Sequence, residues 1–129
     1  YIGEWVNLGA NTNNSDLKNN YSTIKFDMGN TIIDTKETFI GSMVGDYAKT
    51  GISTMLNTGT YIGIGANIFG GDFQDNFIPS FSWGRDDITA IDKFLSTLEI
   101  VKNRRDRVIS SSEKDLIVDL HSSIKSKKF

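Results

Sequence analysis

Residues 44–69 read VGDYAKTGISTMLNTGTYIGIGANIF, and this stretch repeats a pattern every six residues. Cutting it at Val44, Thr50, Leu56 and Ile62 gives VGDYAK, TGISTM, LNTGTY and IGIGAN. The first place of each six is aliphatic or Thr, the fifth is Ala or Thr, and Gly fills the second place in three of the four. This spacing matches neither the 3.6-residue period of a helix nor the alternation of a strand. A six-residue period is typical of a β-solenoid.

In such a fold each six supplies one short strand and one corner, and three of them close one coil. The first and fifth places point inward, while Gly or a small polar residue turns the corner, where a Cβ atom is disfavoured. Successive coils stack at the strand separation of about 4.8 Å. The frame also fits the chain from Ile2 and from Thr38. We therefore predict an all-β solenoid of about four coils, with residues 1–71 as its domain.

The stacking also predicts which side chains share an internal column. If coils of three sixes follow one another without a break, one column holds Ile2, Thr38 and Leu56, and another holds Leu8, Phe26, Val44 and Ile62. The pattern fails over NNSDLKNNY (13–21), because the inward places there would hold Asn and Lys. This stretch is predicted to be a loop that leaves the coil.

The hexapeptide pattern ends in FGGDFQDNFIPSFSWG (69–84). We predict that residues 72–85 form an extended connector whose aromatic side chains pack over the solenoid. Residues 86–129 are predicted to form a tail of two helices, because apolar residues there recur at intervals of three and four. Asp86 or Asp87 would cap the first helix, and Ser112 with Asp115 would begin the second.

Composition excludes several classes of function. The chain has 129 residues, with 14 basic and 16 acidic side chains and a net charge of −2, so we expect no nucleic-acid partner. No run of eighteen apolar residues is present, so we expect no membrane span. The absence of Cys permits a cytoplasmic location. Because Tyr1 already lies inside the repeat and a solenoid end needs a cap, we expect further coils, and a further domain, upstream.

Few side chains are candidates for chemistry. His121 is the only histidine, and no spacing of His, Asp or Glu predicts a metal site. We therefore predict no catalytic residue and no bound cofactor in this chain. Lys18 and Tyr21, on the loop that is predicted to leave the coil, have side chains suited to binding an anionic or sugar-like ligand. The surrounding asparagines also have a purely structural explanation, because Asn tolerates the backbone angles of corners.

WVNLGANTNNSDLKNNYSTIKF (5–26), followed by FIGSMVGDYAKTGISTMLNTGTYIGIGANIF (39–69), resembles the C-terminal left-handed β-helix of sugar-1-phosphate nucleotidyltransferases. The similar families are the bifunctional N-acetylglucosamine-1-phosphate uridylyltransferase/acetyltransferases and the glucose-1-phosphate thymidylyltransferase-like proteins. The resemblance covers residues 1 to about 84, and only some members share a helical tail. It implies that the solenoid is left-handed, against the usual crossover preference.

The resemblance also implies roles for four residues. Asn7 matches an asparagine that contacts the sugar, and Ala10 matches a small residue whose backbone approaches an acetyl group. Lys18 and Tyr21 fall in a loop with a phosphate-binding lysine. Asn11 departs from the family motif, which has Gly there. The family's catalytic histidine and its G-x-G-T-R-L nucleotidyl-transfer loop have no counterpart in this chain.

The resulting hypothesis is the β-helix domain of a cytoplasmic sugar-1-phosphate nucleotidyltransferase, whose upstream domain carries out nucleotidyl transfer and binds Mg²⁺. The domain would assemble homotrimers and bind a sugar phosphate or an acyl-CoA, with acyl transfer from acetyl-CoA to an amino sugar as a further activity. Two alternatives stay open: a structural trimerisation module without a ligand, and part of a stand-alone hexapeptide acyltransferase. The identity of the sugar and nucleotide does not follow from the sequence.

Overall fold

The computed structural model describes residues 1–126, and side chains as far as Ile124. Contacts divide the chain into two compact units, Tyr1–Asp87 and Ile88–Phe129. The first unit consists mostly of short strands in parallel sheets, and the second contains two helices. No helix in the described part of the chain is both long and apolar enough to span a bilayer. The units are described separately below.

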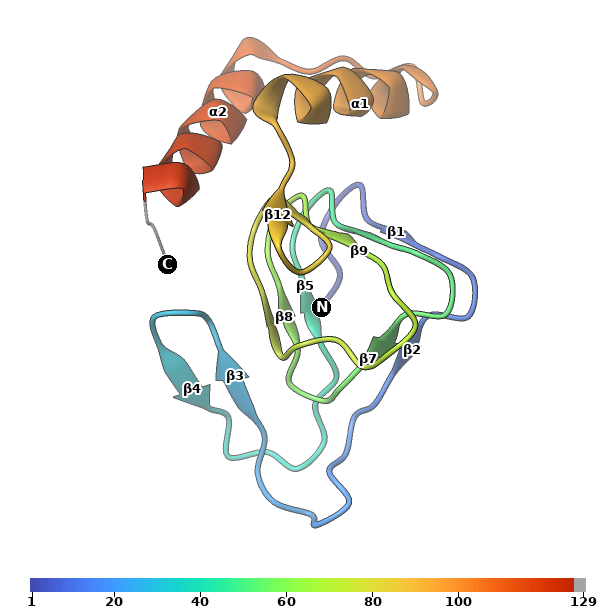
Figure 1. Cartoon of the computed structure of the whole chain (residues 1–129), viewed down its shortest axis with the longest axis vertical. Helices are drawn as coiled ribbons and strands as arrows, with labels where there is room; N and C mark the ends of the chain where they lie inside the picture. The colour runs from blue at the N-terminus through green and yellow to red at the C-terminus, as the bar shows by residue number, and fades with distance from the viewer. Residues whose placement is uncertain (127–129) are drawn as a thin grey trace. The chain divides into compact units, whose positions relative to one another are not determined.

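Three parallel sheets make up most of the first unit (Figure 1). The strands of these sheets are β1 (Asn7–Leu8), β2 (Asn13–Asn14), β5 (Met43–Val44), β6 (Lys49–Thr50), β7 (Met55–Leu56), β8 (Tyr61–Ile62), β9 (Asn67–Ile68), β10 (Phe77–Ile78), β11 (Ser82–Trp83) and β12 (Asp87–Ile88). Their orders are β1-β6-β9-β11-β12, β10-β8-β5 and β2-β7. Along the chain β5, β6 and β7 enter the three sheets in turn, and β8 and β9 repeat the circuit. We call one circuit a rung.

The register shows four rungs, at residues 2–14, 43–56, 61–73 and 77–83. Val44 pairs with Ile62, 18 residues later, and Thr50 pairs with Ile68 at the same spacing. The fourth rung begins two residues earlier than a spacing of 18 would place it, as the pairing of Phe77 with Tyr61 shows. The predicted period of three sixes is therefore confirmed between the second and third rungs. The fourth rung is built from the segment that was predicted as an extended connector, since β10 and β11 both lie in 72–85.

The internal columns predicted for the first half of the chain are wrong. Ile2 pairs with Val44, and Leu8 pairs with Thr50, each 42 residues later. The first and second rungs are therefore separated by an insertion at residues 15–42, which adds four sixes to the normal spacing. Because this addition is a multiple of six, the same places in each six still point inward. The residue with which each of them pairs in the next rung is a different one.

The insertion is larger than the predicted loop. After a polar stretch it forms an antiparallel hairpin of β3 (Lys25–Asp27) and β4 (Ile32–Asp34), which lies beside the coil in Figure 1. Phe26, predicted to lie in a solenoid column, instead pairs with Ile33 across this hairpin. The two ends of the insertion are joined by a hydrogen bond from Ile40 N to Asp16 O at 3.0 Å.

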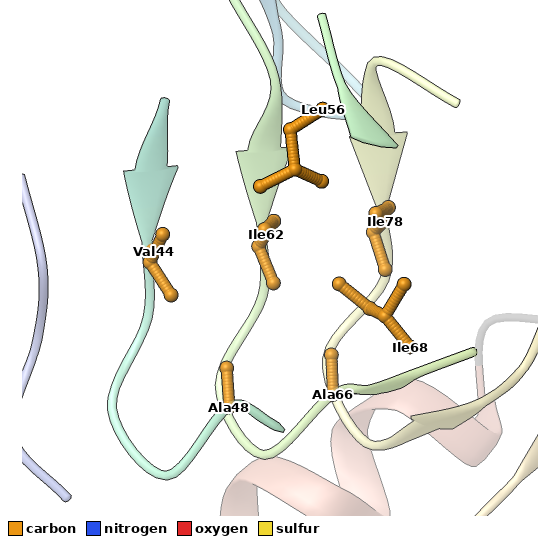
Figure 2. Packing of buried hydrophobic residues seen from close by; sticks show 7 residues of the cluster. All are labelled: Val44, Ala48, Leu56, Ile62, Ala66, Ile68 and Ile78. Atoms are coloured by element: carbon orange, nitrogen blue, oxygen red, sulfur yellow. The ribbon is translucent and has the colours of Figure 1, made fainter. Parts of the chain in front are cut away.

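The inward places of the repeat form the core. Every first and fifth place from Val44 to Ile68 is buried: Val44, Ala48, Thr50, Thr54, Leu56, Thr60, Ile62, Ala66 and Ile68. Figure 2 shows Val44, Ile62 and Ile78 side by side on neighbouring strands, with Ala48 and Ala66 at the bends that follow the strands of Val44 and Ile62. Thr54 and Thr60 bond backward within their own rung, as Thr54 Oγ1 does to Gly51 O at 2.9 Å, whereas Thr50 Oγ1 accepts the amide of Gly9 in the first rung at 3.0 Å. These bonds satisfy the buried hydroxyls of Thr54 and Thr60, whereas the buried Ser82 Oγ has no hydrogen-bond partner among the described residues.

The repeat glycines have a different role from the predicted one. Residues with φ near 60° at one series of corners are Trp5, Tyr47, Gly65 and Phe81, so large side chains also take this left-handed conformation. Most of the glycines at the second places are needed instead for close stacking. A Cβ atom on Gly63 would lie 2.3 Å from the backbone nitrogen of Ser80 in the next rung. At Gly9 and Gly45 a Cβ atom would also lie within 3.0 Å of the backbone of the next rung, whereas at Gly51 it would make an ordinary contact at 3.4 Å.

The second unit contains α1 (Ile91–Asn103) and α2 (Ser111–Ser126). The helices begin elsewhere than predicted: α1 has Ala90 at its N-cap, without a side-chain bond, and Ser110 Oγ accepts the amide of Glu113 at 3.1 Å. Phe94, Leu98 and Ile117 are buried in this unit. Lys102 is also buried, and its Nζ lies 2.5 Å from both carboxylate oxygens of Glu113.

Candidate functional site

The best candidate for a ligand site in the first unit is a polar crevice beside the start of the insertion. Its cavity measures about 500 Å³ and is lined by Ser15, Leu17, Lys18, Asn19, Asn20, Asn57, Thr58 and Phe73. The lining residues thus include three with amide side chains, two with hydroxyls, one lysine and one phenylalanine. We call this set of residues the polar crevice.

The wall of the polar crevice is held to the second rung by Asn14. This side chain donates to Ser42 Oγ at 2.9 Å and lies 3.3 Å from the carbonyl oxygens of Leu56 and Asn57. The amide of Ser15 adds a bond to Leu56 O at 2.9 Å. Asn14 occupies an inward place of the repeat, where an aliphatic residue would normally lie. Its amide therefore stops the first rung and fixes the direction in which the chain leaves it.

Lys18 supplies the only positive charge among the residues that line the polar crevice. It is half-buried, and its Nζ lies 3.4 Å from the carbonyl oxygen of Thr23, which is a long hydrogen bond. None of the ion pairs between described residues involves it. A half-buried ammonium with one weak acceptor can bind an anion without first losing a strong partner.

Phe73 forms the aromatic wall and is 57% exposed. Its backbone is fixed on both sides: it forms a parallel bridge with Met55, and Arg85 Nη2 donates to its carbonyl oxygen at 2.7 Å. Arg85 also pairs with Asp72 at 3.3 Å. The backbone of Phe73 is therefore held in position while more than half of the residue stays accessible. An aromatic face beside amides and an amine can accommodate a ligand with one apolar face and several polar groups.

The four predicted site residues do not form one cluster. Lys18 lines the polar crevice, and its carbonyl accepts the amide of Tyr21 at 2.9 Å, but the Tyr21 side chain is 70% exposed and lies outside the lining. Asn7 lies in β1 opposite Lys49, and Ala10 lies in the next corner, where its carbonyl accepts the amide of Ser53 at 2.8 Å. The structure thus separates a pair on the first rung from a pair in the insertion.

Three lining residues were missed from the sequence, namely Asn57, Thr58 and Phe73. A usable signal existed for the first of them, because the six beginning at Leu56 has Asn in the second place, where the other sixes have Gly. Asn57 and Thr58 come directly after β7, which pairs with β2 at the start of the insertion. Stacking of the rungs therefore brings residues about forty positions apart to one crevice.

The structure shows a structural setting for the single histidine. His121 lies on α2 and is buried, and its Nε2 lies 2.8 Å from the carbonyl oxygen of Thr89. In residues 1–126 no group of three or more His, Cys, Asp or Glu side chains could hold a metal ion.

A search with the sequence finds neither a matching protein-family model nor a similar curated protein.

Proposed function

We propose that this chain is the left-handed β-helix domain of a cytoplasmic sugar-1-phosphate nucleotidyltransferase, and that the polar crevice binds a phosphorylated sugar. The observation that carries the proposal is the combination of Phe73, the amides and Lys18 around one cavity of about 500 Å³. The three parallel sheets, with a return after 18 residues between the second and third rungs, support the β-helix part of the proposal.

The chemistry of the polar crevice matches the three parts of such a ligand. The C–H groups on one face of a pyranose ring pack well on an aromatic ring such as Phe73. Asn19, Asn20 and Asn57 offer both donors and acceptors, which hydroxyl groups require. The Lys18 ammonium would bind the phosphate as a point charge. A neutral sugar would lack the last interaction and would bind more weakly.

The wider role of the domain is proposed from the resemblance alone. The domain would assemble as a homotrimer, and the upstream domain would use Mg²⁺ for nucleotidyl transfer. Asn7 and Ala10 would contribute to acetyl-CoA binding if the parent protein also transfers acyl groups. Asn7 has an exposed side chain that suits such contacts, and the neighbouring carbonyl of Ala10 is taken by Ser53. A trimerisation module without ligands is the alternative.

Calorimetric titration with glucosamine 1-phosphate tests the ligand part of the proposal, with glucosamine as the phosphate-free control. Lys18→Gln should weaken binding of the phosphate about tenfold or more, because one charge-assisted contact is lost. Lys25→Gln, which removes an exposed charge on the hairpin, should leave the affinity unchanged. Equal affinity for the two sugars, or no binding of either, would refute a sugar-phosphate site.

Light scattering tests the assembly separately. A trimer without any ligand binding would favour the structural module, and a monomer would contradict trimer assembly in either form.

A further inference from the structure

A second polar surface lies on the outer side of the sheet that contains β1, β6, β9 and β11. In its register Asn7 pairs with Lys49, Lys49 with Asn67, and Asn67 with Trp83. The next residues along β6 and β9, Thr50 and Ile68, are buried, so this column faces away from the core. Asn7, Lys49 and Asn67 are called the outer column below.

Lys49 is an unusual lysine for a surface strand. It is half-buried, and its Nζ donates to the carbonyl oxygen of Tyr47 at 3.2 Å. None of the ion pairs within residues 1–126 involves it. Burial lowers the pKa of its ammonium, and desolvation is the sole cause. The charge is therefore partly removed from water and lacks a carboxylate to compensate it.

The two amides beside Lys49 have unused hydrogen-bonding capacity. Asn7 is exposed, and its side chain makes no hydrogen bond to any residue that the structure describes. Asn67 Nδ2 reaches the carbonyl oxygen of Gly65 at 3.5 Å, the limit for a hydrogen bond. Neighbouring rungs are about 4.8 Å apart, so the three side chains span roughly 10 Å. An ammonium with an amide on each side offers several donors to one multivalent oxyanion.

We propose that the outer column of Asn7, Lys49 and Asn67 is an anion-binding subsite for the phosphate or diphosphate group of a small molecule. Lys49 neutralises the charge, and the flanking amides donate hydrogen bonds to further oxygens. The subsite is separate from the polar crevice and shares no residue with it. Its existence does not depend on the sugar-phosphate proposal.

Inorganic pyrophosphate is a suitable probe, because it presents the anion without a sugar or a base. The side-chain resonances of Lys49 are followed by NMR during a titration of the full chain. Binding should shift these resonances and raise the pKa of the Lys49 ammonium, since the anion stabilises the charged form. Lys49→Gln should weaken pyrophosphate binding about tenfold or more, because a charge-assisted contact is lost.

Two control variants separate the outcomes. Lys25→Gln removes an exposed charge elsewhere in the first unit and should bind pyrophosphate as the wild type does. Lys18→Gln removes the phosphate-binding charge proposed for the polar crevice, and should leave the response of the Lys49 resonances to pyrophosphate unchanged. Unchanged affinity in Lys49→Gln, or loss of binding only in Lys18→Gln, would overturn the outer-column subsite. So would a Lys49 resonance that responds to protein concentration and not to pyrophosphate, since this would assign the surface to contact between copies of the chain.

Discussion

Replacing Gly63 by Ala should separate the third rung from the fourth. A Cβ atom at this position would lie 2.3 Å from the backbone nitrogen of Ser80, 2.5 Å from its Oγ and 2.6 Å from its Cα. Two of these three atoms belong to the backbone, which cannot rotate away as a long side chain does. Contacts of this kind need more than 3.0 Å, so the rungs must move apart locally by about 1 Å.

The loss of stability follows from what this movement breaks. The amide of Gly63 donates to Ile78 O at 2.8 Å, and the amide of Ile64 donates to Ser80 Oγ at 3.1 Å. Each bond contributes about 1 kcal/mol, and overpacking itself costs about 1–3 kcal/mol. The free energy of unfolding should therefore fall by about 3–5 kcal/mol, a large part of the total for a domain of this size.

Urea unfolding followed by tryptophan fluorescence measures this change. Both tryptophans, Trp5 and Trp83, lie in the first unit, so their signal reports that unit alone. Gly71→Ala is the matched control, because a Cβ atom there meets nothing within 4 Å. The control should change stability by less than about 0.5 kcal/mol. An unchanged midpoint for Gly63→Ala, or an equal loss in both variants, would refute the argument from close stacking.

Three further predictions concern the core, the helices and the hairpin. Ile62→Ala, at a side chain with no exposed surface, should lower the free energy of unfolding by about 3–4 kcal/mol in the same urea assay, and a loss below 1 kcal/mol would contradict a packed core. Glu113→Ala removes the carboxylate that pairs with the buried ammonium of Lys102 and should destabilise the helical unit by about 3 kcal/mol, measured by thermal unfolding in circular dichroism; an unaltered transition would show that the pair is dispensable. Hydrogen bonds from the backbone and side chain of Lys36 lower the pKa of Asp34. The contribution of Asp34 to hairpin stability is therefore present above the ordinary aspartate pKa and is lost as the pH falls through the lowered value. In Lys36→Ala, NMR titration should show the pKa of Asp34 rising part of the way back to its ordinary value.

Most of the core could be predicted because inward and outward places depend on local spacing. A strand residue and its neighbour face opposite sides, so a repeat of six with fixed inward places determines burial wherever a rung is covered on both sides. The same pattern at Ile2 and Leu8 leaves these side chains 54% and 45% exposed, because the second rung covers them on one side only. The pattern describes a rung, and coverage by other rungs is a non-local property.

The candidate site was predictable only in part. Lys18 stood out because it interrupts the repeat, but its partners Asn57 and Phe73 lie about 40 and 55 positions later. Their proximity depends on which rung stacks on which, and the insertion at residues 15–42 alters that pairing without disturbing the six-residue phase. Spacing alone therefore could not choose between a rung partner at 36 residues and one at 42.

The sequence by itself determined three features: the repeat of six, the inward places between Val44 and Ile68, and the presence of two helices after the strands. These features follow from local rules of strand alternation and helical periodicity. Only the tertiary structure decided the rung partners, the hairpin in the insertion, the fourth rung and the composition of the polar crevice. These depend on contacts between segments far apart in the chain, where close backbone approach at glycines such as Gly63 selects the register.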